Sequence, residues 1–281
     1  MKRVLVTGKN SYLGDRFTDY LSQWPDQYEV VQTSLKDTNW QDENWGEYDS
    51  ILNVAGIAHN SSDPKLKDLY YQVNRDLAIA AAQKAKSDGV QQFIHLSSMI
   101  VFGSQIEKIT KDTPPNPDNF YGDSKLQGEI GLQKLEDETF KIAIVRPPMV
   151  YGPHSKGNFP RLVKLAKSTP IFPDYSNRRS MIYVDNLMAE LKAIIDQELS
   201  GTMHPQNEEY TCTSQMVGQI AKLSSHRLAT TRAFNPLIKK MASKGTLGKV
   251  FGNLYYDEML NYREENISLE ESIKRSLIDE E

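Results

Sequence analysis

The sequence predicts an α/β protein built on a doubly wound parallel sheet, with a smaller lobe formed mostly by the C-terminal part of the chain. Short apolar runs alternate with segments of helical periodicity through the first half, and a turn with two glycines separates the first run from the first helix. The chain has 281 residues, of which 39% are apolar and 25% charged, so it can bury a core of ordinary size.

The first strand and the first helix are the clearest elements. Residues 2–7 (KRVLVT) form a β-branched run, which predicts a strand. Within residues 12–24, Leu13, Phe17 and Leu21 recur at helical spacing, which predicts an amphipathic helix. The chain therefore begins with a strand, a turn and a helix.

The alternation continues through the next hundred residues. It predicts strands at 28–33, 51–54, 92–96 and 141–146, with helices at 74–87 and near 125–135. Strands that alternate with helices form a parallel sheet covered by helices on both faces. Prolines 147, 148 and 153 then interrupt the regular pattern.

The remaining part is less regular. It predicts a helix at 160–168, a strand at 181–184 and a helix at 186–196, followed by an irregular tail. We therefore divide the chain into a core at 1–150 and a lobe at 151–281 that interleaves with the last core elements and carries substrate contacts. Residues 236–256 mix lysines with apolar residues; glycines inside the segment favour a cap over a membrane-surface helix.

Charge and cysteine content exclude several classes of protein. The net charge of -4 gives no reason to expect a nucleic-acid partner. The single cysteine, Cys212, cannot form an internal disulfide, and the lack of Cys/His clusters predicts no metal site. No apolar run approaches the roughly 20 residues of a membrane span, and the run within MKRVLVTG is too brief for a signal peptide. We expect a cytoplasmic protein with no membrane contact.

The turn after the first strand is a candidate phosphate-binding loop. It lies where the pyrophosphate of a dinucleotide can meet free N–H groups and the positive end of a helix dipole. Two of the three expected glycines are present, and a serine replaces the middle one. The residues expected to contact a cofactor here are Gly8, Asn10, Ser11, Tyr12, Leu13 and Gly14.

The end of the second strand bears on the choice between NAD and NADP. An acidic residue at this position would bind the ribose diol, but Ser34 stands there. No carboxylate at this position repels a 2′-phosphate, and Lys36 offers a positive charge close by. The sequence therefore favours NADP while leaving NAD open.

Tyr121 and Lys125 form a candidate catalytic pair. They are four residues apart, which puts both on one face of a helix. A neighbouring ammonium favours the phenolate form, so we expect Lys125 to lower the pKa of Tyr121. Ser98 follows the strand at 92–96 and should lie at the carboxyl edge of the sheet, where ligands bind in such folds. The three residues predict a hydroxyl relay.

These motifs together resemble extended short-chain dehydrogenases/reductases, the NAD-dependent epimerase/dehydratase family. The resemblance rests on the glycine turn, SMIVFG (98–103), the Tyr-x-x-x-Lys pair and RPPMVYGP (146–153). It is strongest to UDP-sugar 4-epimerases and 4-ketoreductases of bacterial capsule and O-antigen synthesis, with GNF (157–159), RRSMIYVD (178–185) and HPQ (204–206). It implies a Rossmann-type sheet with the NAD(P) site in residues 1–150.

The resemblance also implies roles for single residues. Tyr121 would be the general acid/base at the sugar O4, Ser98 its hydrogen-bond partner, and Lys125 the residue that holds the nicotinamide ribose. Further residues expected to contact the cofactor are Ser34, Ala55, Gly56, Asn74, Tyr121 and Pro148. Those that would hold the nucleotide sugar, besides Ser98 and Tyr121, are Asn158 and Arg179. His59 is expected to be structural, and relatives often form homodimers through the Tyr-x-x-x-Lys helix.

The reaction itself stays open at this point. Sugar 4,6-dehydratases of the superfamily place an acidic pair after the residue that corresponds to Ser98, but Met99 and Ile100 stand here, so dehydration is rejected. Reduction of a UDP-4-keto-6-deoxy-N-acetylhexosamine is favoured. UDP-glucose or UDP-N-acetylglucosamine 4-epimerisation follows closely, and an inactive NADP-sensing or scaffold protein is the alternative from another class.

Overall fold

The computed structural model describes residues 1–58, 63–241, 245–260 and 267–278. The chain divides into two compact units. The first comprises residues 1–103, 114–147 and 188–205, and the second comprises residues 104–113, 148–187 and 206–281. The chain therefore passes between the units several times; helix α6 (Val184–Asp196), for example, begins in the second and ends in the first.

The first unit contains one sheet of six parallel strands in the order β2-β1-β3-β4-β6-β10. The strands are β1 (Lys2–Thr7), β2 (Tyr28–Thr33), β3 (Ser50–Asn53), β4 (Gln92–Leu96), β6 (Lys141–Val145) and β10 (Gly201–Met203). The strand order reverses between β1 and β3, and such a reversal forms a ligand crevice at the carboxyl edge of a parallel sheet. The prediction of a doubly wound parallel sheet is confirmed.

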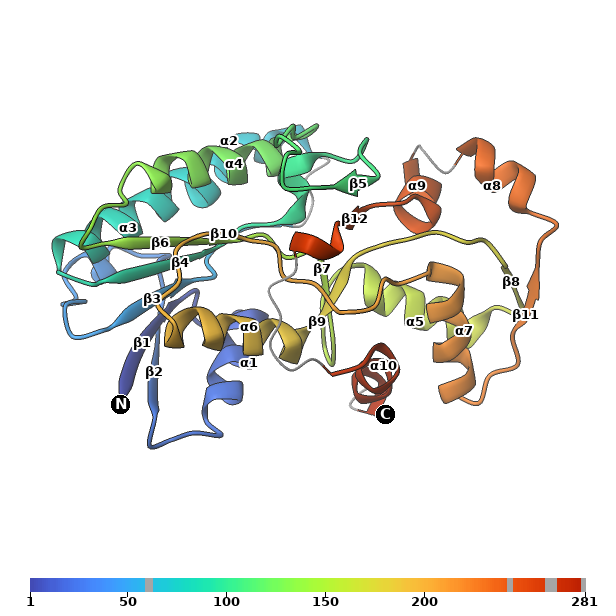
Figure 1. Cartoon of the computed structure of the whole chain (residues 1–281), viewed down its shortest axis with the longest axis horizontal. Helices are drawn as coiled ribbons and strands as arrows, with labels where there is room; N and C mark the ends of the chain where they lie inside the picture. The colour runs from blue at the N-terminus through green and yellow to red at the C-terminus, as the bar shows by residue number, and fades with distance from the viewer. Residues whose placement is uncertain (59–62, 242–244, 261–266, 279–281) are drawn as a thin grey trace. The chain divides into compact units, whose positions relative to one another are not determined.

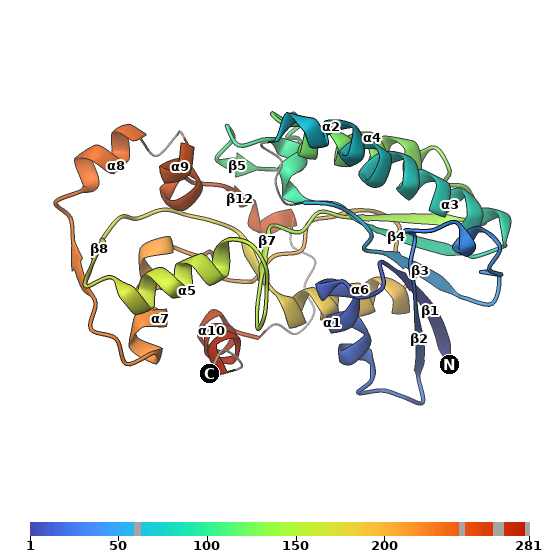
Figure 2. The same cartoon turned by 180° about the vertical axis from the view of Figure 1, so that it is seen from behind.

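Helices cover both faces of this sheet, as Figures 1 and 2 show from opposite sides. On one face lie α2 (Lys67–Tyr71), α3 (Ala78–Ser87) and α4 (Phe120–Gln133), and on the other lie α1 (Tyr12–Leu21) and α6. Short helical turns are η1 (Asn39–Gln41), η2 (Pro64–Leu66), η3 (Gln72–Leu77) and η4 (Met99–Phe102). This is the layered arrangement expected of βα alternation.

Small residues let the helices of one face approach each other closely. The buried residues of α3 are all alanines, at 78, 81, 82 and 85. A Cβ at Gly128 of α4 would lie 2.5 Å from the backbone oxygen of Asn74 in η3. Only glycine permits this approach, which fixes α4 against the segment that carries Asn74.

Two helix boundaries differ from the sequence prediction. The helix predicted at 74–87 begins earlier, at Lys67, and continues through the π-helical turn η3 into α3. Helix α4 begins at Phe120, because the side chain of Asn119 accepts a hydrogen bond from the backbone N–H of Gly122 at 3.0 Å and so caps the helix. Tyr121 therefore lies in the first turn of α4.

The connection between β2 and β3 is anchored by aromatic packing. Trp40 and Trp45 are buried and belong to one hydrophobic cluster with Leu5 of β1 and Ile51 of β3. Their rings lie 5.6 Å apart. This packing holds the connection against the sheet face beside β2.

The second unit consists of short elements. Its strands pair in parallel as β5 (Lys108–Ile109) with β12 (Tyr255–Tyr256), β7 (Met149–Tyr151) with β9 (Met181–Tyr183), and β8 (Ile171–Pro173) with β11 (Ala229–Thr231). Its helices, besides the start of α6, are α5 (Asn158–Ser168), α7 (Thr213–Leu223), α8 (Asn235–Met241), α9 (Gly245–Phe251), η5 (Glu258–Leu260) and α10 (Leu269–Ile278). Residues 236–256 thus contain two short helices and a strand.

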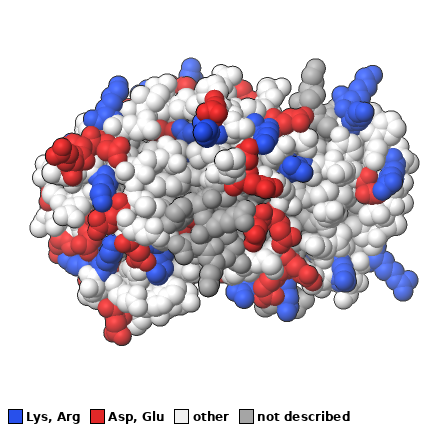
Figure 3. Space-filling view, viewed as in Figure 1, with Lys and Arg blue, Asp and Glu red and all other residues white. Residues whose placement is uncertain are grey.

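Two surface properties follow from the described residues. None of their helices is long and apolar enough to cross a membrane. On the face drawn in Figure 3, acidic and basic side chains are interspersed, in keeping with the small net charge of -4.

Candidate active site

The turn after β1 has the geometry of a phosphate-binding loop. Gly8 has a φ of +108°, which L side chains rarely adopt. Ser11, which replaces the expected middle glycine, is the N-cap of α1, and its hydroxyl accepts a hydrogen bond from the backbone N–H of Gly14 at 3.2 Å. Tyr12 and Leu13 begin the helix. The first N–H groups of a helix lack helical partners, so this turn can bind an anion.

A second turn, after β3, lies directly against the glycine turn. A Cβ at Gly8 would lie 3.0 Å from Cγ2 of Val54 and 3.1 Å from the backbone nitrogen of Ala55. The backbone N–H of Val54 also donates to the carbonyl of Thr7 at 3.2 Å. Asn10, with a φ of 62°, has a left-handed backbone conformation in the first loop. The two turns form one backbone surface where the strand order reverses.

Asn74 ties the second turn to α4. Its Oδ1 accepts a hydrogen bond from the N–H of Ile57 at 2.9 Å, and its Nδ2 donates to the carbonyl of Ile57 at 3.0 Å and to Oγ of Ser124 at 3.1 Å. A Cβ at Gly56 would lie 2.9 Å from Nζ of Lys125 and 3.1 Å from Oδ1 of Asn74. The amide of Asn74, predicted to contact the cofactor, thus fixes the loop beside Lys125.

Ser98 and Tyr121 meet beyond the end of β4. Ser98 is the N-cap of η4, where its Oγ accepts a hydrogen bond from the N–H of Ile100 at 3.3 Å. Its hydroxyl also lies near enough to the phenol of Tyr121 to lower the pKa of that phenol. A Cβ at Gly122 would lie 2.7 Å from the carbonyl oxygen of Ile100, so glycine allows α4 to begin this close to η4. The structure thus brings together two of the three residues of the predicted relay.

The electrostatics of Tyr121 differ from the sequence prediction. Burial raises the pKa of Tyr121 to about 12, and the nearby Ser98 hydroxyl offsets this only in part. The ring of Tyr70 packs edge-on at 5.8 Å. The ammonium of Lys125, expected to lower this pKa, donates instead to the carbonyl of Leu96 at 2.9 Å. The expectation of a lowered pKa was wrong because burial, which the sequence does not reveal, is the larger effect.

A buried ion pair that the sequence analysis did not identify lies beside Lys125. Glu129, one helical turn further along α4, accepts hydrogen bonds from Nη2 of Arg146 at 2.6 Å and from Nε of Arg146 at 3.1 Å. The hydroxyl of Ser97, next to Ser98, donates to the same carboxylate. The guanidinium of Arg146 also lies over the ring of Phe102 at 5.1 Å. This network fixes the end of β4 and the face of α4 that carries Tyr121 and Lys125.

Two of the predicted sugar contacts, Asn158 and Arg179, lie in the second unit. Asn158 is the first residue of α5 and is exposed. Arg179 is half-buried, its backbone pairs with that of Thr211, and its Nη1 donates to the carbonyl of Gly252 at 3.0 Å. Burial lowers the pKa of Arg179. Pro148 begins a stretch of this unit.

The sequence analysis also considered Ser34, Lys36 and His59. Ser34 follows the end of β2, and its hydroxyl accepts a hydrogen bond from the backbone N–H of Lys36 at 3.2 Å. Lys36 is exposed. His59 lies outside the described residues.

The first unit fits a nicotinamide dinucleotide. Gly8 and Gly56 leave spaces that a Cβ would fill at the glycine turn and beside Lys125, and the two turns connect these places along one edge of the sheet. Lys125 and the backbone of the second turn would hold the nicotinamide half, and the glycine turn would hold the pyrophosphate. Among the residues that the structure describes, no cluster of His, Cys, Asp and Glu could hold a metal ion.

Comparison with known proteins decides the family. Residues 4–207 match the NAD dependent epimerase/dehydratase family. The chain belongs to this family.

Curated relatives resemble part of the chain, and solved structures resemble nearly all of it. The chain is 32% identical to a UDP-glucose 4-epimerase of Vibrio cholerae over 155 residues, which cover 52% of this chain and 47% of that protein. The chain spans about half the length of the curated relatives it matches.

Two solved structures show the same fold over nearly the whole chain. A dTDP-4-dehydrorhamnose reductase of Bacillus anthracis, in complex with NADP, has a TM-score of 0.78 at 21% identity and covers 100% of both chains. A UDP-glucuronic acid 4-epimerase of Bacillus cereus, in complex with NAD, has a TM-score of 0.75 at 16% identity and covers 99% of this chain and 98% of that one. The fold is that of extended short-chain dehydrogenases/reductases.

The buried lysine Lys125 predicts a pH-dependent stability of the protein. Burial lowers the pKa of Lys125 to about 8 from 10.5, with Glu129 opposing the shift. Between pH 8 and 10.5 the unfolded chain binds a proton that the folded chain has released, so the free energy of unfolding rises with pH across this window. Across this window, the free energy of unfolding of the cofactor-free wild type should rise by on the order of 3 kcal/mol relative to that of Lys125→Met.

Urea denaturation of both proteins at pH 7, 8, 9 and 10 measures this difference. The comparison with Lys125→Met cancels the titration of all other groups. A difference that stays constant over the series would show that Lys125 keeps an ordinary pKa in the folded protein.

Proposed function

We propose that the chain catalyses the NAD(P)-dependent reduction of a keto group at C4 of a nucleotide sugar. The observation that carries the proposal is the buried phenol of Tyr121 with the Ser98 hydroxyl near it, beyond the end of β4. With a pKa raised to about 12, the phenol keeps its proton at neutral pH. A protonated phenol is a general acid, and reduction of a ketone requires one because the oxygen gains a proton as the carbon gains a hydride.

The residues around Tyr121 support this role. The dinucleotide supplies the hydride when bound. Tyr121 donates its proton to the oxygen at C4, and the Ser98 hydroxyl near the phenol orients the ketone oxygen beside it. The ammonium of Lys125 lies within the same first unit next to Gly56, where it can bind the ribose of the nicotinamide half and stabilise the phenolate left by proton transfer.

The proposed substrate is a UDP-4-keto-6-deoxy-N-acetylhexosamine of surface polysaccharide synthesis. Arg179 and Asn158 in the second unit are the proposed contacts to its diphosphate. A guanidinium has five N–H donors in a fork that matches phosphate, and Arg179 uses one of them on Gly252. Met99 and Ile100, which follow Ser98, cannot transfer protons, so loss of water is not part of the proposed reaction.

UDP-glucose or UDP-N-acetylglucosamine 4-epimerisation is the second candidate. The similar protein of Vibrio cholerae is a UDP-glucose 4-epimerase, which favours this reaction. The same three residues would serve it, with Tyr121 accepting the proton in one half-reaction and returning it in the other. The third candidate is a protein without catalytic activity that senses NADP or acts as a scaffold. The joint presence of Ser98, Tyr121 and Lys125 argues against this candidate.

One pair of assays tests the proposal. The protein is mixed with NADH or NADPH and a UDP-4-keto-6-deoxy-N-acetylhexosamine, and the absorbance of the reduced cofactor is followed. We expect one reduced cofactor to be consumed for each sugar reduced. In parallel, UDP-glucose and UDP-N-acetylglucosamine are incubated with the protein and followed by NMR. Epimerisation there, with no cofactor consumption in the first assay, would replace the reductase by the epimerase.

We also propose that this reaction takes place in the cytoplasm, the compartment that supplies reduced dinucleotides. A homodimer through α4, expected from the resemblance, stays a prediction.

A further inference from the structure

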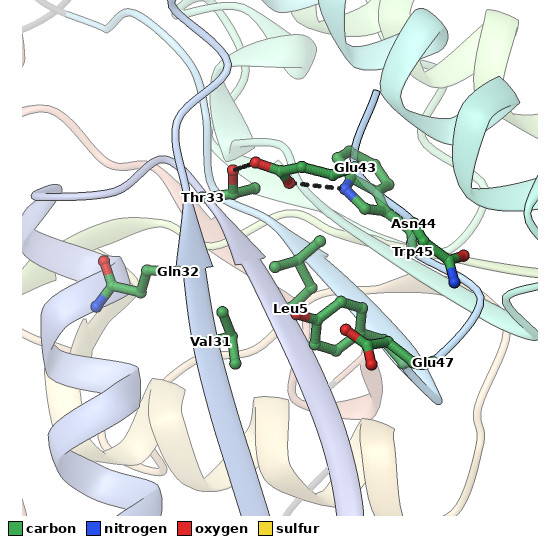
Figure 4. Close-up of a pocket in the computed structure, with 9 residues that line it drawn as sticks. Leu5, Val31, Gln32, Thr33, Glu43, Asn44, Trp45 and Glu47 are labelled. Carbon is green, nitrogen blue, oxygen red and sulfur yellow. Dashed lines mark hydrogen bonds between the residues drawn. The ribbon is translucent and has the colours of Figure 1, made fainter. Parts of the chain in front are cut away.

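The carboxyl end of β2 carries a carboxylate that comes from further along the chain. Glu43 belongs to the connection between β2 and β3, and its side chain reaches back to the last residue of β2 (Figure 4). Its Oε1 accepts a hydrogen bond from Oγ1 of Thr33 at 3.0 Å, and its Oε2 accepts one from Nε1 of Trp45 at 3.1 Å. Trp45 is fully buried, so the carboxylate is held in place from the core.

The same strand end touches the glycine turn. The backbone N–H groups of Gly8 and Lys9 both donate to the carbonyl of Thr33 at 3.0 Å. A pyrophosphate at the glycine turn places the adenosine ribose over the end of the second strand. Ser34, the residue at that position in the sequence, offers a hydroxyl but no charge. Glu43 is therefore the carboxylate that the ribose would meet.

The hollow beside Glu43 is lined by carboxylates and not by cations among the described residues. The carboxylates are those of Glu43 and Glu47, and the volume of the hollow is about 380 Å³. Arg3, on the same side of the sheet, forms ion pairs with Glu29 at 2.8 Å and with Glu47 at 2.7 Å. A 2′-phosphate would bring nearly two further negative charges to this place, whereas a 2′-hydroxyl can donate a hydrogen bond to a carboxylate.

We propose that Glu43 selects NAD(H) over NADP(H). Its carboxylate accepts a hydrogen bond from the ribose 2′-hydroxyl and repels a 2′-phosphate. This assignment replaces the expectation from Ser34 and Lys36, which considered only residues adjacent in sequence to the end of β2. The proposal requires the dinucleotide site and does not depend on which sugar reaction the protein catalyses.

Direct titration of the whole protein with NADH and with NADPH, without sugar, tests it. We expect the wild type to bind NADH at least about tenfold more tightly than NADPH, and Glu43→Gln to narrow this ratio by about tenfold, chiefly by tightening NADPH. Because Glu43 is exposed, the variant should fold as the wild type does.

Two matched variants sharpen the result. Glu47→Gln also removes one negative charge from this hollow, but Glu47 is paired with Arg3 and lies away from Thr33. The ratio of the affinities for NADH and NADPH should therefore stay at the wild-type value. Lys36→Gln should also leave it unchanged. A wild type that prefers NADPH, a ratio that Glu47→Gln alters as much as Glu43→Gln does, or a chain that binds neither dinucleotide would overturn the proposal.

Discussion

Replacing Tyr121 by phenylalanine is expected to lower kcat by about 10²- to 10⁴-fold, the usual contribution of a general acid or base. The substitution removes only the phenolic oxygen near Ser98, so the ring keeps its edge-on contact with Tyr70. The Kd for the dinucleotide should remain near the wild-type value, because Lys125 and the glycine turn are untouched. Steady-state kinetics with the sugar turned over, together with cofactor titration, measures both quantities.

Tyr151→Phe is the matched control for this loss. Tyr151 is also a buried phenol whose pKa is raised to about 12, and its hydroxyl hydrogen-bonds to Ser272 at 2.6 Å in the second unit. Its removal should lower the free energy of unfolding but leave kcat close to the wild-type value. If Tyr121→Phe kept full activity, or if both variants lost activity equally, the role of Tyr121 in proton transfer would have to be abandoned.

Much of the first unit could be predicted from the sequence because its elements have a clear period. The strands β1, β2 and β4 coincide with the predicted ranges 2–7, 28–33 and 92–96, each an apolar run with polar or turn residues beside it. Their alternation with helices is enough to predict a parallel sheet. The start of the helix predicted at 74–87 could not be found, since the π-helical turn η3 shifts the spacing of the buried residues there.

The second unit could not be predicted in the same way. Strands such as β5 and β12 have two residues each and show no alternation that a sequence could reveal. Helices α7 and α10 lie in the part of the chain that the sequence analysis treated as an irregular tail. Short elements of this kind depend on tertiary packing more than on local periodicity.

The candidate site was predictable only where it follows from sequence spacing. The end of a strand and the start of a helix bring Ser98 and Tyr121 to one edge of the sheet. The direction of the Tyr121 pKa shift was not predictable, because it depends on burial. The position of Glu43 was also not predictable, because the folding of a loop, and not sequence spacing, brings this residue to Thr33.

The largest effect on stability is expected from the pair of Arg146 and Glu129. Replacing Arg146 by methionine leaves the carboxylate of Glu129, which is 1% exposed, without its hydrogen-bonded cation and with the Ser97 hydroxyl as its remaining hydrogen-bond partner. An unpaired buried charge costs about 3–5 kcal/mol. Urea denaturation should show this loss in the free energy of unfolding. Activity should also fall where the protein remains folded, because the network adjoins Ser98 and Lys125.

Arg275→Met provides the comparison that separates burial from pairing. Arg275 also forms an ion pair, with Glu271 at 2.9 Å, but the two side chains are 47% and 41% exposed. Water already solvates both partners there, so the loss should be below about 1 kcal/mol. The double variant Glu129→Leu with Arg146→Met should be more stable than Arg146→Met alone, since no buried charge is left behind. Equal losses in Arg146→Met and Arg275→Met would mean that the buried carboxylate finds another partner or takes up a proton.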